Sequence, residues 1–86
     1  GEETKVTIEA ENSMAGVLID RFGKDIFIAP VDENHFRTVV NVAVSNQFLG
    51  WIMALGGGIK IVSPDTVVDQ MKAEIRRLSM QYGANI

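Results

Sequence analysis

Polar and hydrophobic residues follow two different periods at the start of the chain, which predicts a strand followed by a helix. Over residues 5–11 every second side chain is hydrophobic, and a period of two is typical of a strand with one buried face. Hydrophobic residues then recur at helical spacing over residues 14–22. Asn12 or Ser13 can cap this helix, because a short side-chain oxygen accepts from the free amides of the first turn. Gly23 is well suited to end it.

The next part of the chain predicts a hairpin of two strands. Residues 26–31 form a hydrophobic run, but Pro30 has no backbone N–H, so this strand is expected at a sheet edge or to end near the proline. Residues 32–35 are expected to turn, with Asn34 as the best candidate for a left-handed backbone. Alternation resumes over residues 36–44, which predicts the second strand of the hairpin.

A second helix is expected after the hairpin, with hydrophobic residues nearly all round it. Residues 48–55 contain only hydrophobic side chains and one glycine, which predicts burial on more than one side. Ser45 or Asn46 can cap its start. The three glycines at 56–58 are expected to end it.

The last part of the chain predicts a short strand and a long amphipathic helix. Residues 59–61 give the strand, and Ser63 can cap the helix that follows. Pro64 fits the first helical position, and Asp65 favours the positive end of the helix dipole. Gly83 is expected to end this helix. Its hydrophobic positions form one stripe: Val67, Met71, Ile75, Leu78 and Tyr82.

The order β-α-β-β-α-β followed by a helix predicts an α+β fold. Its symmetric arrangement is a ferredoxin-like sandwich, in which two helices cover one face of a four-stranded antiparallel sheet. The 86 residues are expected to form a single domain, residues 1–86, because they leave no room for a second core. The additional C-terminal helix needs a surface to cover, which is the free sheet face, a sheet edge or a partner molecule.

Composition narrows the classes of function. A hydrophobic share of 47% supports a real core, and no stretch reaches the ~20 residues of a membrane span. The chain lacks cysteine, so disulfides and thiolate metal sites are excluded, and we expect a cytoplasmic location. The net charge of −3 with scattered basic residues argues against direct binding to nucleic acid. Gly1 without a preceding Met suggests a fragment of a longer protein.

Residue chemistry points to binding rather than catalysis. His35 is the only histidine and lies in an expected turn, where a solvated role is favoured over metal binding. The glycines at 56–58 lie between a helix and a strand, whereas phosphate loops lead from a strand into a helix. No nucleophile has a recognisable base. We therefore expect no enzyme activity, no cofactor and no metal.

Three side chains remain as candidate contacts with a partner or a ligand. Trp51 and Phe48 lie on the strongly hydrophobic helix, whose surface is a candidate interface. Arg37 is expected on the sheet face opposite the valines, where it is a candidate ligand contact.

Taken together, the chain resembles the C-terminal extension domain of WYL-family transcriptional regulators, the bacterial proteins often called DeoR-like. The likeness covers nearly the whole chain, and its motifs are structural. They are an apolar helix with Trp, a glycine stop, a short strand and a helix led by proline. The matching residues are 49–52 (LGWI), 55–56 (LG), 59–64 (IKIVSP) and, at the end of the first helix, 19–23 (IDRFG).

The resemblance implies a regulatory module rather than a complete regulator. In that family a winged helix-turn-helix binds DNA, a WYL domain senses a ligand, and the ferredoxin-like extension takes part in dimer contacts and relays the signal. This chain resembles only the extension, so DNA contact is expected only through the missing N-terminal domain. The resemblance implies a homodimer and allows a small effector or nucleotide ligand, with no membrane. The DNA-reading and sensor residues of the family match no position here.

A second hypothesis is a small-molecule-binding regulatory domain of the ACT type, which senses amino acids. The same β-α-β-β-α-β order supports it, as does the turn over residues 11–16 that leads into the first helix.

Overall fold

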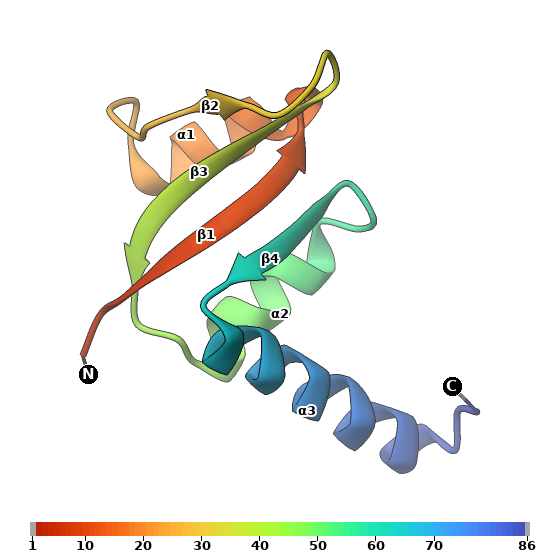
Figure 1. Cartoon of the computed structure of the whole chain (residues 1–86). Coiled ribbons are helices and arrows are strands. Elements are labelled where there is room, and N and C mark those ends of the chain that lie inside the picture. The colour runs from red at the N-terminus through yellow and green to blue at the C-terminus, as the bar shows by residue number, and fades with distance from the viewer. Residues whose placement is uncertain (1, 86) are drawn as a thin grey trace.

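The computed structural model describes residues 2–85, and it confirms the α+β, ferredoxin-like order of elements (Figure 1). The element order along the chain is β1 (Thr4–Glu11), a 3₁₀ turn η1 (Asn12–Met14), α1 (Ala15–Phe22), β2 (Ala29–Pro30), β3 (His35–Val42), α2 (Asn46–Ala54), β4 (Ile59–Ser63) and α3 (Asp65–Tyr82).

The four strands form one antiparallel sheet in the order β2-β3-β1-β4. Helices α1 and α2 lie against one face of this sheet, and the other face is open (Figure 1). Strand β1 is central, and its residue Glu9 is paired in register with Arg37 on β3 and with Lys60 on β4. Strands β2 and β4 are therefore the two edges of the sheet.

One hydrophobic core lies between the sheet and the helices. Alternate residues of β1 and β3 face it, as the period of two predicted, and the all-round hydrophobic α2 adds three buried side chains. Fully burying such a side chain contributes roughly 1.5–3 kcal/mol. The hydroxyl of Thr38 is also buried, 0% exposed, and has no hydrogen-bond partner among the described residues. The buried hydrophobic residues are Val6, Ile8, Ala10, Leu18, Phe36, Val40, Phe48, Leu49, Ile52, Ile59, Ile61 and Val67.

The predicted helix caps are right at α2 and wrong at the other two helices. Ser45 Oγ accepts a hydrogen bond from the backbone N–H of Phe48 at 3.3 Å, which caps α2. Neither Asn12 nor Ser13 caps α1, because both lie inside the 3₁₀ turn. The Asn12 amide instead donates to the carbonyl of Glu33 at 2.9 Å and ties this turn to the hairpin.

The start of α3 lies one residue later than the sequence predicted. Ser63 belongs to β4 and makes no capping bond, and Pro64 is the residue just before the helix rather than its first residue. Asp65 is in the first turn, as expected from the helix dipole. Gly83 ends α3 in the left-handed conformation, with φ of 64°.

The hairpin is shorter and its turn is built differently from the prediction. Strand β2 is at the sheet edge but spans only Ala29–Pro30, and β3 ends at Val42. No described residue other than glycine has a positive φ, so Asn34 is not left-handed. The turn is held by the Asp32 side chain, which accepts from the Asn34 N–H at 2.7 Å.

Helix α3 packs at its first turns and then leaves the body of the molecule (Figure 1). Its first turns contact β4, and Val67 is buried at 2% exposure. Val68 and Met71 are partly buried against the core. The following turns project away from the sheet, so α3 covers neither the open sheet face nor the edge at β2.

Candidate functional site

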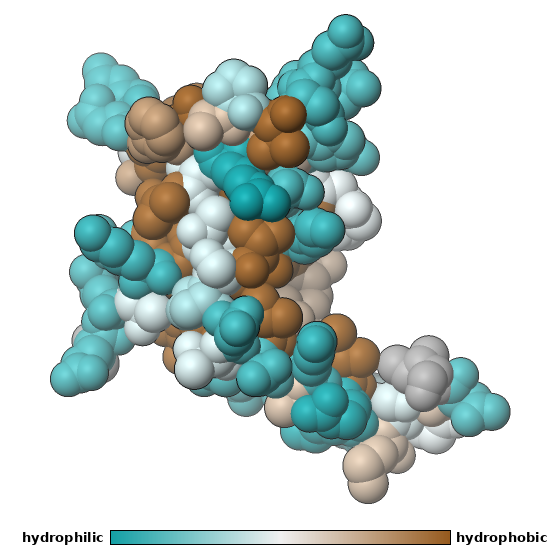
Figure 2. Space-filling view, viewed as in Figure 1, coloured by the Kyte–Doolittle hydropathy of each residue, from teal (hydrophilic) through white to brown (hydrophobic). Residues whose placement is uncertain are grey.

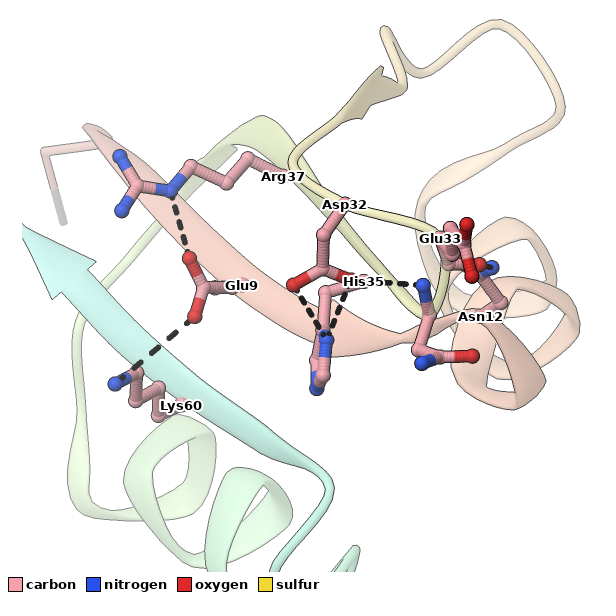
Figure 3. Close-up of polar contacts among 8 residues, drawn as sticks. Glu9, Asn12, Asp32, Glu33, His35, Arg37 and Lys60 are labelled. Atoms are coloured by element: carbon pink, nitrogen blue, oxygen red, sulfur yellow. Dashed lines mark hydrogen bonds and ion pairs between the residues drawn. The ribbon is translucent and has the colours of Figure 1, made fainter.

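A charged row crosses the open sheet face at the middle of β1 (Figure 3). Arg37 Nε donates to Glu9 Oε1 at 2.9 Å, and Lys60 Nζ lies 3.9 Å from the other carboxylate oxygen. The three residues are direct neighbours in the register, which places one carboxylate between two cations. Arg37 is half exposed, so water screens this pair and its net stabilisation is about 0–1 kcal/mol.

Arg37 therefore lies on the open sheet face, as the sequence predicted, but its guanidinium is already paired. Glu9 accepts from the Nε–H of Arg37, so an anionic ligand there would meet a guanidinium whose charge a carboxylate already partly offsets. Neither Glu9 nor Lys60 was among the residues expected at a site, although both lie on the polar face of their strands. Only the register of the sheet shows that all three residues meet.

The β2–β3 turn holds the only histidine in an acidic setting. His35 Nδ1 lies 2.9 Å and 3.1 Å from the two carboxylate oxygens of Asp32. This hydrogen bond raises the pKa of His35 and outweighs the opposing effect of desolvation, and the charges of Asp32, Glu9 and Glu11 raise the pKa further. The pKa of Asp32 is lowered, first by the N–H of Asn34 and then by His35. His35 therefore stays protonated to a higher pH than a free histidine does.

Two shallow cavities flank this histidine at the end of the sheet. One of about 190 Å³ is lined by Glu9, Glu11, His35 and Lys60, together with backbone of residues 57–59 and Ala10. The other, of about 460 Å³, lies at the turn from β1 into α1 and is lined by Glu11, Asn12, Ser13, Asn34 and His35. Within residues 2–85 no three His, Asp or Glu side chains are close enough to hold a metal ion.

Trp51 packs within the molecule more than the sequence suggested. Its ring meets Phe22 edge-on at 5.7 Å between centroids and stacks with Phe48 at 6.5 Å. The Arg21 guanidinium lies 4.8 Å from the Trp51 ring centroid, a cation–π contact that covers the ring from α1. Trp51 is half-buried, so part of it remains accessible. The expectation of a partner contact from Phe48 is wrong in this structure, because its side chain is 2% exposed and belongs to the core.

Three exposed large hydrophobic side chains lie on the projecting half of α3. Ile75, Met80 and Tyr82 are 42%, 84% and 77% exposed. Ile75 and Tyr82, with Leu78, line a wholly apolar hollow of about 400 Å³ on the helix surface. The hydrophobic stripe that the sequence predicted is therefore real, but only its first half is covered.

A second apolar hollow connects this stripe to the body. It has a volume of about 220 Å³ and lies between α2, β4 and the proximal part of α3. Met71 lines it, and Lys72 stands beside Met71 at its rim. By contrast, Figure 2 shows the open sheet face as a mixture of hydrophobic and hydrophilic side chains. The apolar hollows thus lie along α3 and not on the open sheet face.

Comparison with known proteins gives one family. A family model described as the WCX domain matches residues 2–79, which is almost the whole chain. No curated protein matches the chain significantly. Among the described residues, no helix combines the length and the hydrophobicity that crossing a membrane requires.

Proposed function

The chain belongs to the WCX domain family, the C-terminal domain of WYL-containing regulators, and from this premise we propose that it is a dimerisation and signal-relay module of a bacterial transcriptional regulator. The observation that supports dimerisation is the distal half of α3. A helix that keeps a hydrophobic stripe after leaving its own core exposes surface that association would bury. DNA would be contacted by a helix-turn-helix domain elsewhere in such a regulator, in the cytoplasm.

The attachment of α3 supports a role in relaying a signal. The helix has 18 residues and is therefore about 27 Å long at ~1.5 Å per residue. Val67 fixes its proximal end in the core beside β4. A partner that holds the distal end is thus coupled to the sheet through one rigid element.

Sedimentation velocity over a wide concentration range tests the dimerisation proposal. We expect a monomer when dilute and a dimer when concentrated. An Ile75→Ser/Tyr82→Ser variant should shift the equilibrium to monomer, because it removes hydrophobic surface from the distal stripe. Val39→Ser is the matched control, since Val39 is 46% exposed on the open sheet face. A wild-type chain that stays monomeric throughout would contradict the proposal.

A second candidate function is binding of a small molecule of the amino-acid class. The observation that favours it is the hollow of about 460 Å³ at the turn from β1 into α1, where Asn12, Asn34 and Glu11 offer polar atoms. A thermal-shift screen with the proteinogenic amino acids tests it, with Asn12→Ala as the variant expected to lose any stabilisation. If no amino acid raises the melting temperature of the wild type, this candidate fails.

A further inference from the structure

Exposed large hydrophobic side chains gather at two places that differ in charge. The helix patch consists of the exposed Ile75 and Tyr82 and the half-buried Leu78, which line one hollow on distal α3. The edge patch consists of Phe27, Ile28 and Val31, which flank β2 and are 70%, 40% and 48% exposed. Outside these two patches, the only large hydrophobic side chains among residues 2–85 with comparable exposure are Val17, Val39 and Met80, and Met80 lies on the opposite side of α3 from the helix patch.

The helix patch is surrounded by cations. Over residues 72–82 there are three basic residues and one acidic residue, a formal charge of +2. Arg77 is engaged with Glu74 and with Gln81 on its own helix. Lys72 and Arg76 make no ion pair with any described residue. Two cations are thus available beside the exposed stripe.

The edge patch is surrounded by anions. Over residues 24–33 there is one basic residue and three acidic residues, a formal charge of −2. Asp32 is engaged with His35. Asp25 and Glu33 form no salt bridge within residues 2–85. The two patches are therefore complementary in charge as well as being both hydrophobic.

The topology prevents one molecule from joining its own two patches. Strand β2 is one edge of the sheet, and α3 leaves from β4 at the opposite edge (Figure 1). The edge at β2 also suits a helix better than an added strand, because β2 has only two residues and Pro30 has no N–H for a ladder bond. The helix patch of one copy therefore fits the edge patch of a second copy.

We propose that the helix patch of one chain docks on the edge patch of a second copy, with Lys72 and Arg76 facing Asp25 and Glu33. The contact joins two different surfaces, and because it recurs with the two copies exchanged, the complete interface is isologous. Made twice about a two-fold axis, the contact closes a dimer in which each copy gives α3 and receives α3. This inference deepens the proposed dimerisation role by naming its two surfaces.

Charge reversal at each patch separates this arrangement from the alternatives. The helix variant is Lys72→Glu/Arg76→Glu, and the edge variant is Asp25→Lys/Glu33→Lys. All four side chains are exposed, so both variants should keep the wild-type circular dichroism spectrum. Each variant alone would bring like charges together at both contacts, and we expect self-association to weaken about 10-fold or more.

Mixing the two variants provides the decisive observation. In the mixed dimer the reversed helix meets the reversed edge, and the unaltered helix meets the unaltered edge. A 1:1 mixture should therefore sediment as a dimer at a concentration where each variant alone is a monomer. The matched control is Glu2→Lys/Glu3→Lys, which carries the same net charge as the edge variant but lies outside the patch. Mixed with the helix variant, the control should form only its own dimers, so the helix variant stays monomeric and half of the protein in the mixture sediments as monomer.

The outcomes distinguish this inference from the broader proposal. A wild-type dimer that neither variant weakens overturns the inference and leaves the dimerisation proposal standing. An edge variant that dimerises like the wild type also overturns the inference, because it would indicate that α3 of one copy pairs with α3 of the other. A mixture that stays monomeric also overturns the inference. A wild type that never associates overturns both.

Discussion

The two halves of α3 have the same sequence pattern and opposite surroundings. In the proximal half Val67 is buried against the sheet, and in the distal half Ile75 and Tyr82 face solvent. Both halves belong to one uninterrupted helix with one hydrophobic stripe. A hydrophobic stripe therefore predicts that one side of a helix is covered. It does not predict whether the cover comes from the same chain or from a partner. In a module of a larger regulator, the uncovered half is the part available to a partner.

The strongest way to test this contrast is to shorten one side chain in each half. Val67→Ala should lower the free energy of unfolding by about 2 kcal/mol, because it removes two buried methyl groups and leaves a cavity. Ile75→Ala should change it by less than about 0.5 kcal/mol in the monomer, since its side chain already meets water. Urea titrations at a concentration where the chain is monomeric measure both. Equal losses would show that the distal half is part of the fold.

A smaller effect on the free energy of unfolding is expected in the core, at the buried hydroxyl of Thr38. This hydroxyl has no hydrogen-bond partner, so its burial costs free energy that nothing offsets. Thr38→Val should raise the free energy of unfolding by about 1 kcal/mol. Chemical denaturation measures the change, and Thr7→Val on the opposite face of the sheet is the control. A loss of stability at Thr38 would mean that its hydroxyl has a partner in solution.

The smallest effect on stability is expected at the exposed turn between β2 and β3, which holds Asp32 and His35. The raised pKa of His35 gives stabilisation that is complete below about pH 6.5 and is lost as pH rises through the folded-state pKa. The lowered pKa of Asp32 gives stabilisation that is complete above about pH 3.8 and is lost as pH falls through its folded-state pKa. The turn is therefore most stabilising between these two values.

Asp32→Asn should return the pKa of His35 toward its ordinary value, since it removes the carboxylate that holds the proton. An NMR titration of the His35 ring measures this, and Glu33→Gln is the neighbouring control. An unchanged His35 pKa in the Asp32 variant would show that the pair does not form in solution.

The sequence predicted the elements that depend on local periodicity and missed features that depend on register. The alternation of β1, the hydrophobic surface of α2 and the stripe of α3 were all found, because burial imposes a period on the side chains. Ser45 was found as a cap, while Asn12 was not recognised as a tether because its partner Glu33 lies 21 residues away.

At the candidate site, too, the sequence missed what depends on strand register and on packing. Arg37 was placed on the correct face, but its pairing with Glu9 follows from how β1 and β3 align, which the pattern alone does not specify. Phe48 was named as a candidate contact because a uniformly hydrophobic helix does not show which side faces the core. The division of α3 into a covered and an uncovered half depends on where β4 ends, and only the folded chain reveals it.

Hydrogen exchange of the α3 backbone amides at two protein concentrations shows whether a second copy covers the distal half of this helix. In dilute solution the distal amides should exchange faster than the proximal amides, because fewer contacts hold their helical turns closed. At high concentration the amides of residues 75–82 should become more protected from exchange, while those of the proximal turns should change little. Distal protection that does not depend on concentration would contradict the claim that a second copy covers this half of the helix.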